Sequence, residues 1–311
     1  MTAGSDAKII LVVRPTRLDE LIARFNSAAQ AQFYVEHLGA DFSDYLMEHK
    51  HYGAAASAAE TGLRDFGRVQ RLERRYLANF VFGPEDLVVV LGQDGLVANT
   101  LKYLDGQRVI GVNPDPARWD GVLLPFTVKD LRRVVPEQQA HRRPVKPVTM
   151  AKATLSTGAV LHAVNDLFIG PRSHVSARYS IAVGGRTEQQ SSSGIIVSTG
   201  LGSTGWLKSI YAGWAATSAA LGGATAPAPD GAFAWDADFL HYYVREPFPS
   251  RATGCSIVLG RIGRAESLEL VSQMPEHGIV FSDGIEADFL EFGSGVKAVI
   301  GVAERCGMLV I

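Results

Sequence analysis

The amino-acid sequence predicts an α/β N-terminal domain with a parallel sheet, followed by a C-terminal domain that is mostly β and sandwich-like. The chain has 311 residues, more than one compact core usually holds. Continuous apolar runs alternate with helical patterns in the first third of the chain. After Val148, short runs with period-two alternation and glycine turns replace that pattern.

The first domain, residues 1–128, begins with the apolar run 8–13, which predicts a buried parallel strand. Thr16 and Asp19 have the spacing of a helix start, and apolar spacing continues the helix toward Gly39. Residues 42–78 have a weaker helical pattern. The stretch 86–113 then shows strand, glycine loop, helix and strand, which is a βαβ unit. This arrangement is Rossmann-like.

The second domain, residues 129–311, opens with a proline-containing connector over 135–147. A hairpin turn is expected at 156–158 and a helix over 203–221. The remaining expected elements are strands, at 148–155, 159–169, 179–183, 194–198, 240–245, 256–261, 268–272 and 279–282. The last apolar runs, 296–302 and 308–311, could return to either domain.

Composition excludes several classes of protein. A formal net charge of -2 argues against nucleic-acid binding, which normally needs a basic surplus. We find neither a secretory signal nor an apolar run of the roughly 18 residues that a membrane span needs. Two cysteines cannot form a disulfide framework. We therefore expect a cytoplasmic protein with no nucleic-acid or membrane partner.

The loop Gly92-Gln93-Asp94-Gly95 follows the clearest strand of the chain. Glycine allows backbone to approach phosphate closely, and a carboxylate at a helix start can accept a proton from a hydroxyl or bind a phosphate-held metal. Asn113 ends the next strand, and ligands of open α/β sheets lie beyond such strand ends. Taken alone, the loop also fits a tight turn with a capping aspartate.

Three polar segments lie in the second domain. The run 198–205, Ser-Thr-Gly-Leu-Gly-Ser-Thr-Gly, joins a strand to a helix and offers backbone and hydroxyl donors to an anion. Asn165-Asp166 could hold the two hydroxyls of a ribose, and Asp283-Gly284 follows another strand. Each segment also fits an ordinary turn or helix cap.

In order and spacing, these segments resemble the motifs of the NAD kinase family. The family's Gly-Gly-Asp-Gly-Thr motif corresponds to 92–96, its Asn-Glu/Asp pair to 165–166, its serine- and threonine-rich block to 193–206, and its late Asp-Gly to 283–284. The stretch 109–125 and the opening Val-Val-Arg-Pro-Thr-Arg are similar to the mitochondrial-type branch. The wider superfamily includes diacylglycerol kinases.

The resemblance implies a kinase that transfers the γ-phosphoryl of ATP, or of polyphosphate, to the adenosine 2'-hydroxyl of NAD(H). It implies nucleotide binding in the first domain, dinucleotide binding in the second, Mg²⁺ with ATP, and a homodimer or homotetramer. Asp94 would be the catalytic base or orienter. The implied substrate-binding residues are Gly92, Gln93, Gly95, Asn113, Asn165, Asp166, Ser193, Thr199, Ser203, Thr204, Gly205, Trp206, Ser209 and Asp283.

Four positions depart from the family pattern. Gln93 replaces a glycine, Leu96 a threonine and Ser193 an aspartate, and Gly200-Leu201 replaces proline and a hydroxyl residue. Because Asp94 is kept, we expect an active kinase with altered substrate preference. Two alternatives remain open: a kinase of the same superfamily for another nucleotide, a sugar or a lipid, and a non-catalytic dinucleotide-binding regulator.

Overall fold

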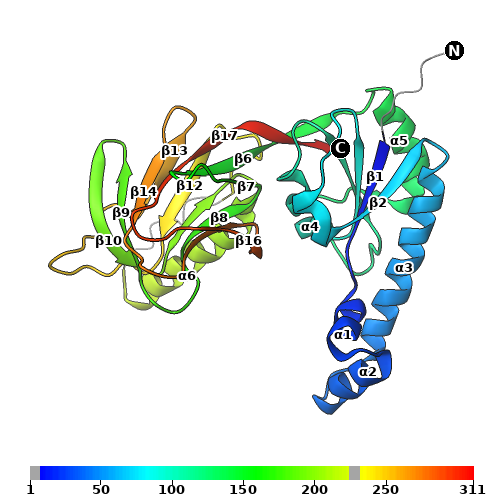
Figure 1. Ribbon diagram of the computed structural model, residues 1–311, viewed down its shortest axis with the longest axis horizontal. Coiled ribbons are helices and arrows are strands. Elements are labelled where there is room, and N and C mark those ends of the chain that lie inside the picture. The colour runs from blue at the N-terminus through cyan, green and yellow to red at the C-terminus, as the bar shows by residue number, and fades with distance from the viewer. Residues whose placement is uncertain (1–7, 224–231) are drawn as a thin grey trace. The chain divides into compact units, whose positions relative to one another are not determined.

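The computed structural model describes residues 8–223 and 232–311 (Figure 1). The chain divides into two compact units, the first ending at Lys146 and including Met308–Ile311, the second spanning Pro147–Gly307. The sequence places the division after residue 128 instead. The stretch 128–139 belongs to the first unit because its helix α5 (Leu131–Gln139) packs in that unit's core.

The first unit is built on a parallel sheet with the strand order β2-β1-β3-β4. Its strands are β1 (Lys8–Val13), β2 (Arg68–Glu73), β3 (Leu87–Leu91), β4 (Arg108–Asn113) and the short β5 (Phe126–Thr127), which pairs with β4. Every residue of β3 is buried, since helices cover both faces of the sheet (Figure 1).

The helices of this unit are α1 (Arg17–Phe25), α2 (Ala28–His37), α3 (Ser43–Leu63), α4 (Asp94–Leu101) and α5 (Leu131–Gln139), with the 3-10 turns η1 (Arg74–Asn79) and η2 (Val128–Asp130). α3 and α5 pack on alternate residues of β1. The expected capping box of Thr16 and Asp19 starts α1. The single helix expected there is broken at Asn26, which takes a left-handed conformation with φ of 65°.

Two other expectations are corrected. The weak helical pattern over 42–78 is α3 followed by the strand β2 and the turn η1. The expected connector over 135–147 is helical as far as Gln139, because Val134, Val135 and Gln138 face the core. Pro136 lies inside this helix.

The second unit consists of antiparallel strands: β6 (Val145–Leu155), β7 (Val160–Ala163), β8 (Asp166–Pro171), β9 (Ala177–Val183), β10 (Arg186–Ser192), β11 (Ile195–Ser198), β12 (Phe239–Val244), β13 (Leu259–Gly263), β14 (Leu268–Ser272), β15 (Gly278–Ser282), β16 (Ile285–Glu291) and β17 (Lys297–Val310). One sheet has the order β13-β12-β11-β8-β15-β16, and another contains β10-β9-β14-β17. Their buried faces share one apolar core, so the sandwich-like expectation is confirmed.

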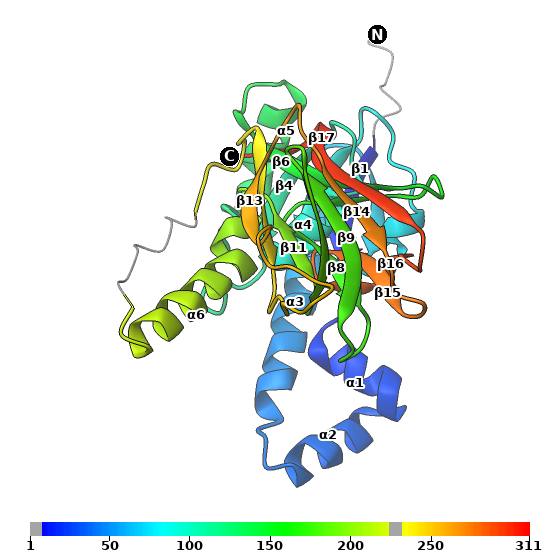
Figure 2. The ribbon, with the colours of Figure 1, turned by 90° about the vertical axis from the view of Figure 1, so that its left-hand side faces the viewer.

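The C-terminal strand β17 shows which domain the last apolar runs, 296–302 and 308–311, pair with. β17 pairs with β14 through Lys297–Ile300 in the second unit, and its Met308 and Leu309 pair with β4 in the first. Helix α6 (Trp206–Ala220), preceded by the turn η3 (Gly202–Thr204), buries only Leu207 and Tyr211 and extends away from the sheets of its own unit (Figure 2).

Candidate functional site

Asp94 is the first residue of α4 and follows the carboxyl end of β3. Its carboxylate accepts backbone hydrogen bonds from Leu123 N at 2.7 Å and Val122 N at 3.2 Å. A carboxylate has about four acceptor positions, so two remain for a ligand or a proton. The side chain is therefore held in one orientation while keeping the capacity to act on a hydroxyl.

Asn113 shapes the loop that Asp94 holds. Its Nδ2 donates to Trp119 O at 2.8 Å and its Oδ1 accepts from Asp115 N at 3.0 Å. The side chain is buried, so the structure gives it an internal role in the loop 114–124. Gly111 in β4 contributes as well: a Cβ there would stand 1.9 Å from Leu123 O, so only glycine admits this loop.

Of the other residues in the segment 92–96, some pack inside the unit and others are exposed. A Cβ on Gly92 would meet Leu96 Cδ2 at 2.8 Å, and Leu96 itself is buried. Leu96, at a position where the motif that 92–96 resembles has threonine, therefore fills the space over Gly92. Gly95 is exposed, with nothing within 4 Å of its Cβ position, and Gln93 lines a cavity described below.

In the second unit, Asp283 joins the segments that the sequence singled out. Its Oδ1 accepts from the backbone N–H of Asn165 at 2.7 Å, Val164 at 3.1 Å and Asp166 at 3.3 Å, while Asp283 N donates to Asp166 O. The Thr199 hydroxyl donates to Val164 O. The Asn165-Asp166 pair, the turn after β11 and the turn after β15 thus form one hydrogen-bonded cluster.

Two predicted hydroxyl donors are used inside this cluster. Thr199 and Ser203 are fully buried. Ser203 Oγ donates to Gly200 O at 2.7 Å and accepts from Phe233 N at 3.2 Å. These two side chains therefore stabilise the loop. Of the neighbouring residues, Thr204 and Gly205 are exposed and could contact a ligand.

Asn165 and Asp166 are the residues of the cluster whose side chains could contact a ligand. Within residues 8–223 and 232–311, the enclosed Oδ1 of Asp166 has no hydrogen-bond partner. Burial raises the pKa of the Asp166 carboxyl to about 7; the Ser198 hydroxyl opposes the rise and the charge of Asp283 adds to it. A Cβ on Gly202 would stand 2.8 Å from Asp166 Oδ1, so glycine is required beside this carboxyl.

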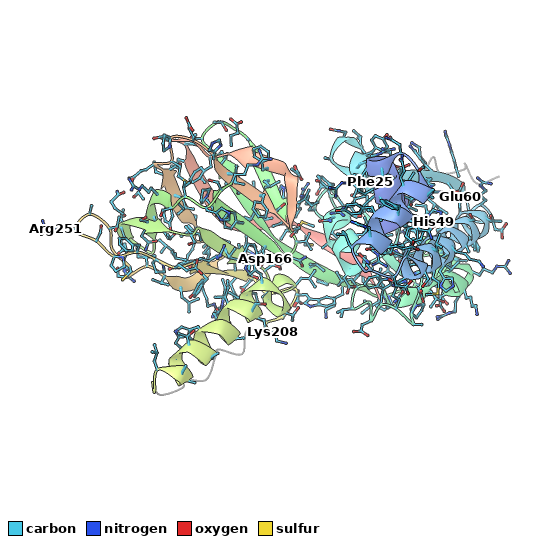
Figure 3. All side chains as sticks on the ribbon, turned by 90° about the horizontal axis from the view of Figure 1, so that it is seen from below. Phe25, His49, Glu60, Asp166, Lys208 and Arg251 are labelled. Atoms are coloured by element: carbon cyan, nitrogen blue, oxygen red, sulfur yellow. The ribbon has the colours of Figure 1, made fainter. Side chains whose placement is uncertain are left out.

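The start of α6 carries the remaining predicted residues. Figure 3 shows Asp166 close to the end of this helix that bears Lys208. Thr204, Gly205 and Ser209 are exposed there. Trp206 stacks on Phe168 of β8 with ring centroids 5.9 Å apart, and the Arg245 guanidinium lies 5.7 Å from the Trp206 ring. Trp206 is thus already packed on one aromatic neighbour.

Ser193 is separated from this cluster along its own strand. It precedes β11, whereas Thr199 follows it, and the four residues of β11 alone span roughly 13 Å at about 3.3 Å each. Its side chain is exposed, and its backbone N–H donates to Arg245 O at 2.9 Å. The structure therefore does not bring Ser193 together with Asn165 and Asp166.

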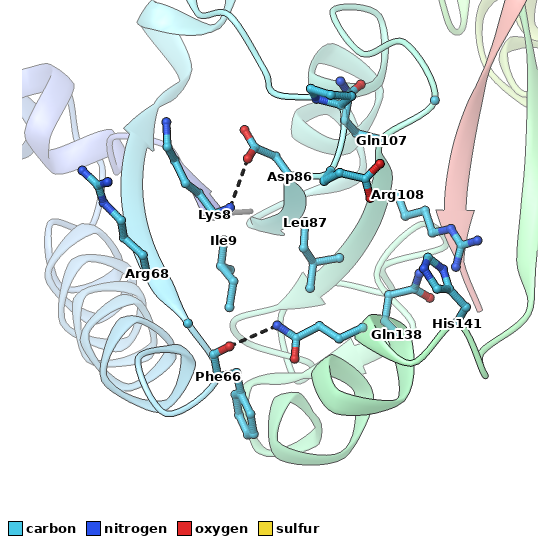
Figure 4. Close-up of a pocket in the computed structure, with 15 residues that line it drawn as sticks. Lys8, Ile9, Phe66, Arg68, Asp86, Leu87, Gln107, Arg108, Gln138 and His141 are labelled. Carbon is cyan, nitrogen blue, oxygen red and sulfur yellow. Dashed lines mark hydrogen bonds between the residues drawn. The ribbon is translucent and has the colours of Figure 1, made fainter. Parts of the chain in front are cut away.

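Two cavities of the first unit lie at opposite edges of its sheet. The larger, about 670 Å³, lies at the amino ends of the strands beside Lys8, Arg68 and Arg108 and contains none of the predicted site residues (Figure 4). The smaller, about 230 Å³, lies at the carboxyl ends and includes Gln93. Its arginines are functional candidates that sequence reasoning missed, because they come from separate elements.

No protein-family model and no curated protein sequence matches the chain. The chain does match solved structures. An NAD kinase from Archaeoglobus fulgidus in complex with ATP has a TM-score of 0.57 and 16% identity, covering 98% of this chain and 93% of that one. Yeast NADH kinase complexed with NADH has a TM-score of 0.56 and 15% identity, covering 99% and 84%. The chain therefore has the two-domain fold of these NAD kinases.

Two other kinds of site are absent from the described residues. No helix of the described residues is long and apolar enough to cross a membrane. The same residues contain no group of three or more histidine, cysteine, aspartate or glutamate side chains placed to hold a metal ion. A Mg²⁺ ion that arrives on nucleotide phosphates usually needs only one or two protein carboxylates, and Asp94 fits that requirement.

Proposed function

We propose that this protein is an NAD kinase-like phosphotransferase, which transfers the γ-phosphoryl of ATP or polyphosphate to the adenosine 2'-hydroxyl of NAD(H). The observation that carries the proposal is the cluster at Asp283, which holds Asn165 beside Asp166, whose Oδ1 is unpaired among the residues that the structure describes. An amide and a carboxyl side by side suit the two hydroxyls of a ribose. The shared fold with NAD kinases over nearly the whole chain supports the same assignment.

Asp94 would act on the attacking hydroxyl. The backbone donors of Val122 and Leu123 fix its carboxylate, and the remaining acceptor positions can take the hydroxyl proton. Phosphoryl transfer depends mainly on positioning and on charge stabilisation, so a rigid carboxylate is well suited to the role. Mg²⁺ bound to the phosphates would neutralise their charge. The stretches 12–17 and 109–125, which flank this edge of the sheet, support the mitochondrial-type branch.

A non-catalytic dinucleotide-binding role is the second candidate. It is favoured by the same two hydrogen bonds, because a carboxylate that anchors Val122 and Leu123 has a structural function without any chemistry. Leu96 and Ser193, which lack the family's polar groups, point the same way.

The test is formation of NADP(H) by purified protein with Mg²⁺, each donor (ATP and polyphosphate) and each acceptor (NAD and NADH). Binding of NAD and NADH is measured in parallel by calorimetry. Turnover with any pairing supports the kinase assignment. Binding without turnover in every pairing would favour the regulator, and absence of both would refute the dinucleotide assignment.

A further inference from the structure

The larger cavity of the first unit lies at the amino ends of its parallel strands (Figure 4). It is lined by the first residue of β1, β2, β3 and β4, which are Lys8, Arg68, Leu87 and Arg108. β4 alone separates it from Asn113, at the edge of the sheet that carries Asp94, by roughly 16 Å at about 3.3 Å per residue. The cavity is therefore distinct from the proposed catalytic site.

Its size and its apolar wall suit a small molecule. The volume of about 670 Å³ lies within the roughly 300–1,000 Å³ of small-molecule sites. Ile9 and Leu87 line the cavity as buried apolar residues, and the partly buried Phe66 lines it as well. Such sites combine an apolar wall for the carbon skeleton of the ligand with a few polar groups that orient it.

Two polar groups of this wall are unsatisfied. Gln138 of α5 is only 2% exposed, and its Oε1 has no hydrogen-bond partner within residues 8–223 and 232–311. The enclosed Nη1 of Arg108 has no acceptor in the same residues. Figure 4 draws both side chains on the side of the cavity that carries His141. Because an unpaired buried polar group destabilises a fold, an acceptor and a donor left open at one cavity indicate a ligand that satisfies both.

The charges around the cavity favour an anion. Lys8, Arg68 and Arg108 line it and form no ion pair among the described residues. Two carboxylates oppose them: Glu85 is exposed, and both oxygens of Asp86 accept backbone N–H groups at 2.8 and 3.1 Å. The C-terminal end of α5 adds roughly half a negative charge. These groups reduce the positive surplus without cancelling it.

We propose that this cavity binds a small organic oxyanion that also carries a hydrogen-bond donor. The anionic group pairs with Arg108, and the donor binds Gln138 Oε1, which can only accept. Phosphate and carboxylate share the required chemistry, because a planar guanidinium binds two oxygens of either group. The site is additional to those of the proposed function and does not depend on it.

The test uses three probes with related carbon skeletons. Glucose 6-phosphate and gluconate carry hydroxyl donors with a phosphate or a carboxylate, and glucose has the hydroxyls alone. Calorimetry measures their binding to the wild type, Arg108→Met, Gln138→Met and Arg132→Met. Arg132 is the matched control, since it is an exposed arginine of α5 that does not line the cavity.

We expect the wild type to bind at least one of the two anions and not glucose, and the anion that binds identifies the phosphate or the carboxylate. Arg108→Met should weaken this binding by about tenfold to a hundredfold, the loss of a charge-assisted hydrogen bond. Gln138→Met should weaken it less, and Arg132→Met should match the wild type. Absence of binding by both anions, or equal anion affinity in Arg108→Met and wild type, would overturn the inference.

Urea unfolding without ligand separates a binding role from a structural one. Arg108→Met and Gln138→Met each remove an unsatisfied buried atom and keep a side chain of similar length, so their urea midpoints should equal or exceed that of the wild type. A lower midpoint in both variants would show that the two groups are already satisfied in the free protein, and would contradict the inference.

Discussion

The Oδ1 atom of Asp283 lies 2.7 Å from the backbone nitrogen of Asn165 and accepts its hydrogen bond. The two residues are far apart in the sequence, and this contact joins the turn after β15 to the start of β8. Asp283 takes a left-handed conformation with φ of 54°, which aspartate and asparagine tolerate better than other non-glycine residues. The strand-end turn expected at Asp283-Gly284 is therefore also the anchor of the Asn165-Asp166 pair.

The substitution Asp283→Asn should destabilise the protein by about 1.5–3 kcal/mol, because the neutral amide replaces a charged acceptor of three backbone N–H groups. Affinity for NAD(H) should fall with it, as Asn165 loses its support. Urea unfolding and calorimetry measure the two effects. The control Asp236→Asn changes an exposed aspartate of the same unit, and should leave both values unchanged. Equal stability of Asp283→Asn and wild type would show that the contact is unimportant.

Asp166 should make stability depend on pH. Its folded-state pKa of about 7 lies above its ordinary 3.8, so the folded protein holds the proton more tightly than the unfolded chain does. The resulting stabilisation is complete below about pH 4 and is lost as the pH rises through about 7.

Asp166→Asn has no proton to lose, and it serves as the reference. Between about pH 5 and about pH 8, the wild type should lose unfolding free energy relative to Asp166→Asn. Urea unfolding at both pH values gives the comparison. A difference between the two proteins that stays constant with pH would contradict a raised pKa.

Gly202 should be needed for the same cluster. A Cβ at this position would lie 2.2 Å from Asn165 O and 2.8 Å from Asp166 Oδ1. Gly202→Ala must therefore displace the pair, and we expect NAD(H) affinity to fall by at least about tenfold, the equivalent of 1.4 kcal/mol. Gly213→Ala in α6 is the control, since its Cβ would meet nothing within 4 Å. Unchanged dinucleotide affinity in Gly202→Ala would remove Asn165 and Asp166 from the site.

Burial explains which elements the sequence predicts. β1, β3 and β4 are enclosed on both faces, so they appear as continuous apolar runs. β2 and β10 lie at sheet edges with mostly exposed or partly exposed residues, Arg-Val-Gln-Arg-Leu-Glu and Arg-Thr-Glu-Gln-Gln-Ser-Ser, and neither is predicted. An edge strand with polar side chains has no apolar pattern to detect.

The candidate site is predictable only in part, for a different reason. Glycine and aspartate at strand ends indicate Asp94, Asn165, Asp166 and Asp283 as polar loop residues. Residue type does not show that Thr199 and Ser203 use their hydroxyls internally, since their partners are set by the folded loops. Likewise, the cavity that Gln93 lines brings together Arg14 after β1, Arg17 of α1 and Arg74 of η1, and no local pattern marks it.

Asp94 tests the central claim most directly. The measurement is NADP(H) formation by wild type, Asp94→Asn and Asp120→Asn, the last being an exposed aspartate of the loop that Asp94 holds. We predict turnover in wild type and Asp120→Asn, and a loss of about 10²–10⁴-fold in Asp94→Asn with dinucleotide binding retained. Equal turnover in Asp94→Asn and wild type would contradict a catalytic role for this carboxylate.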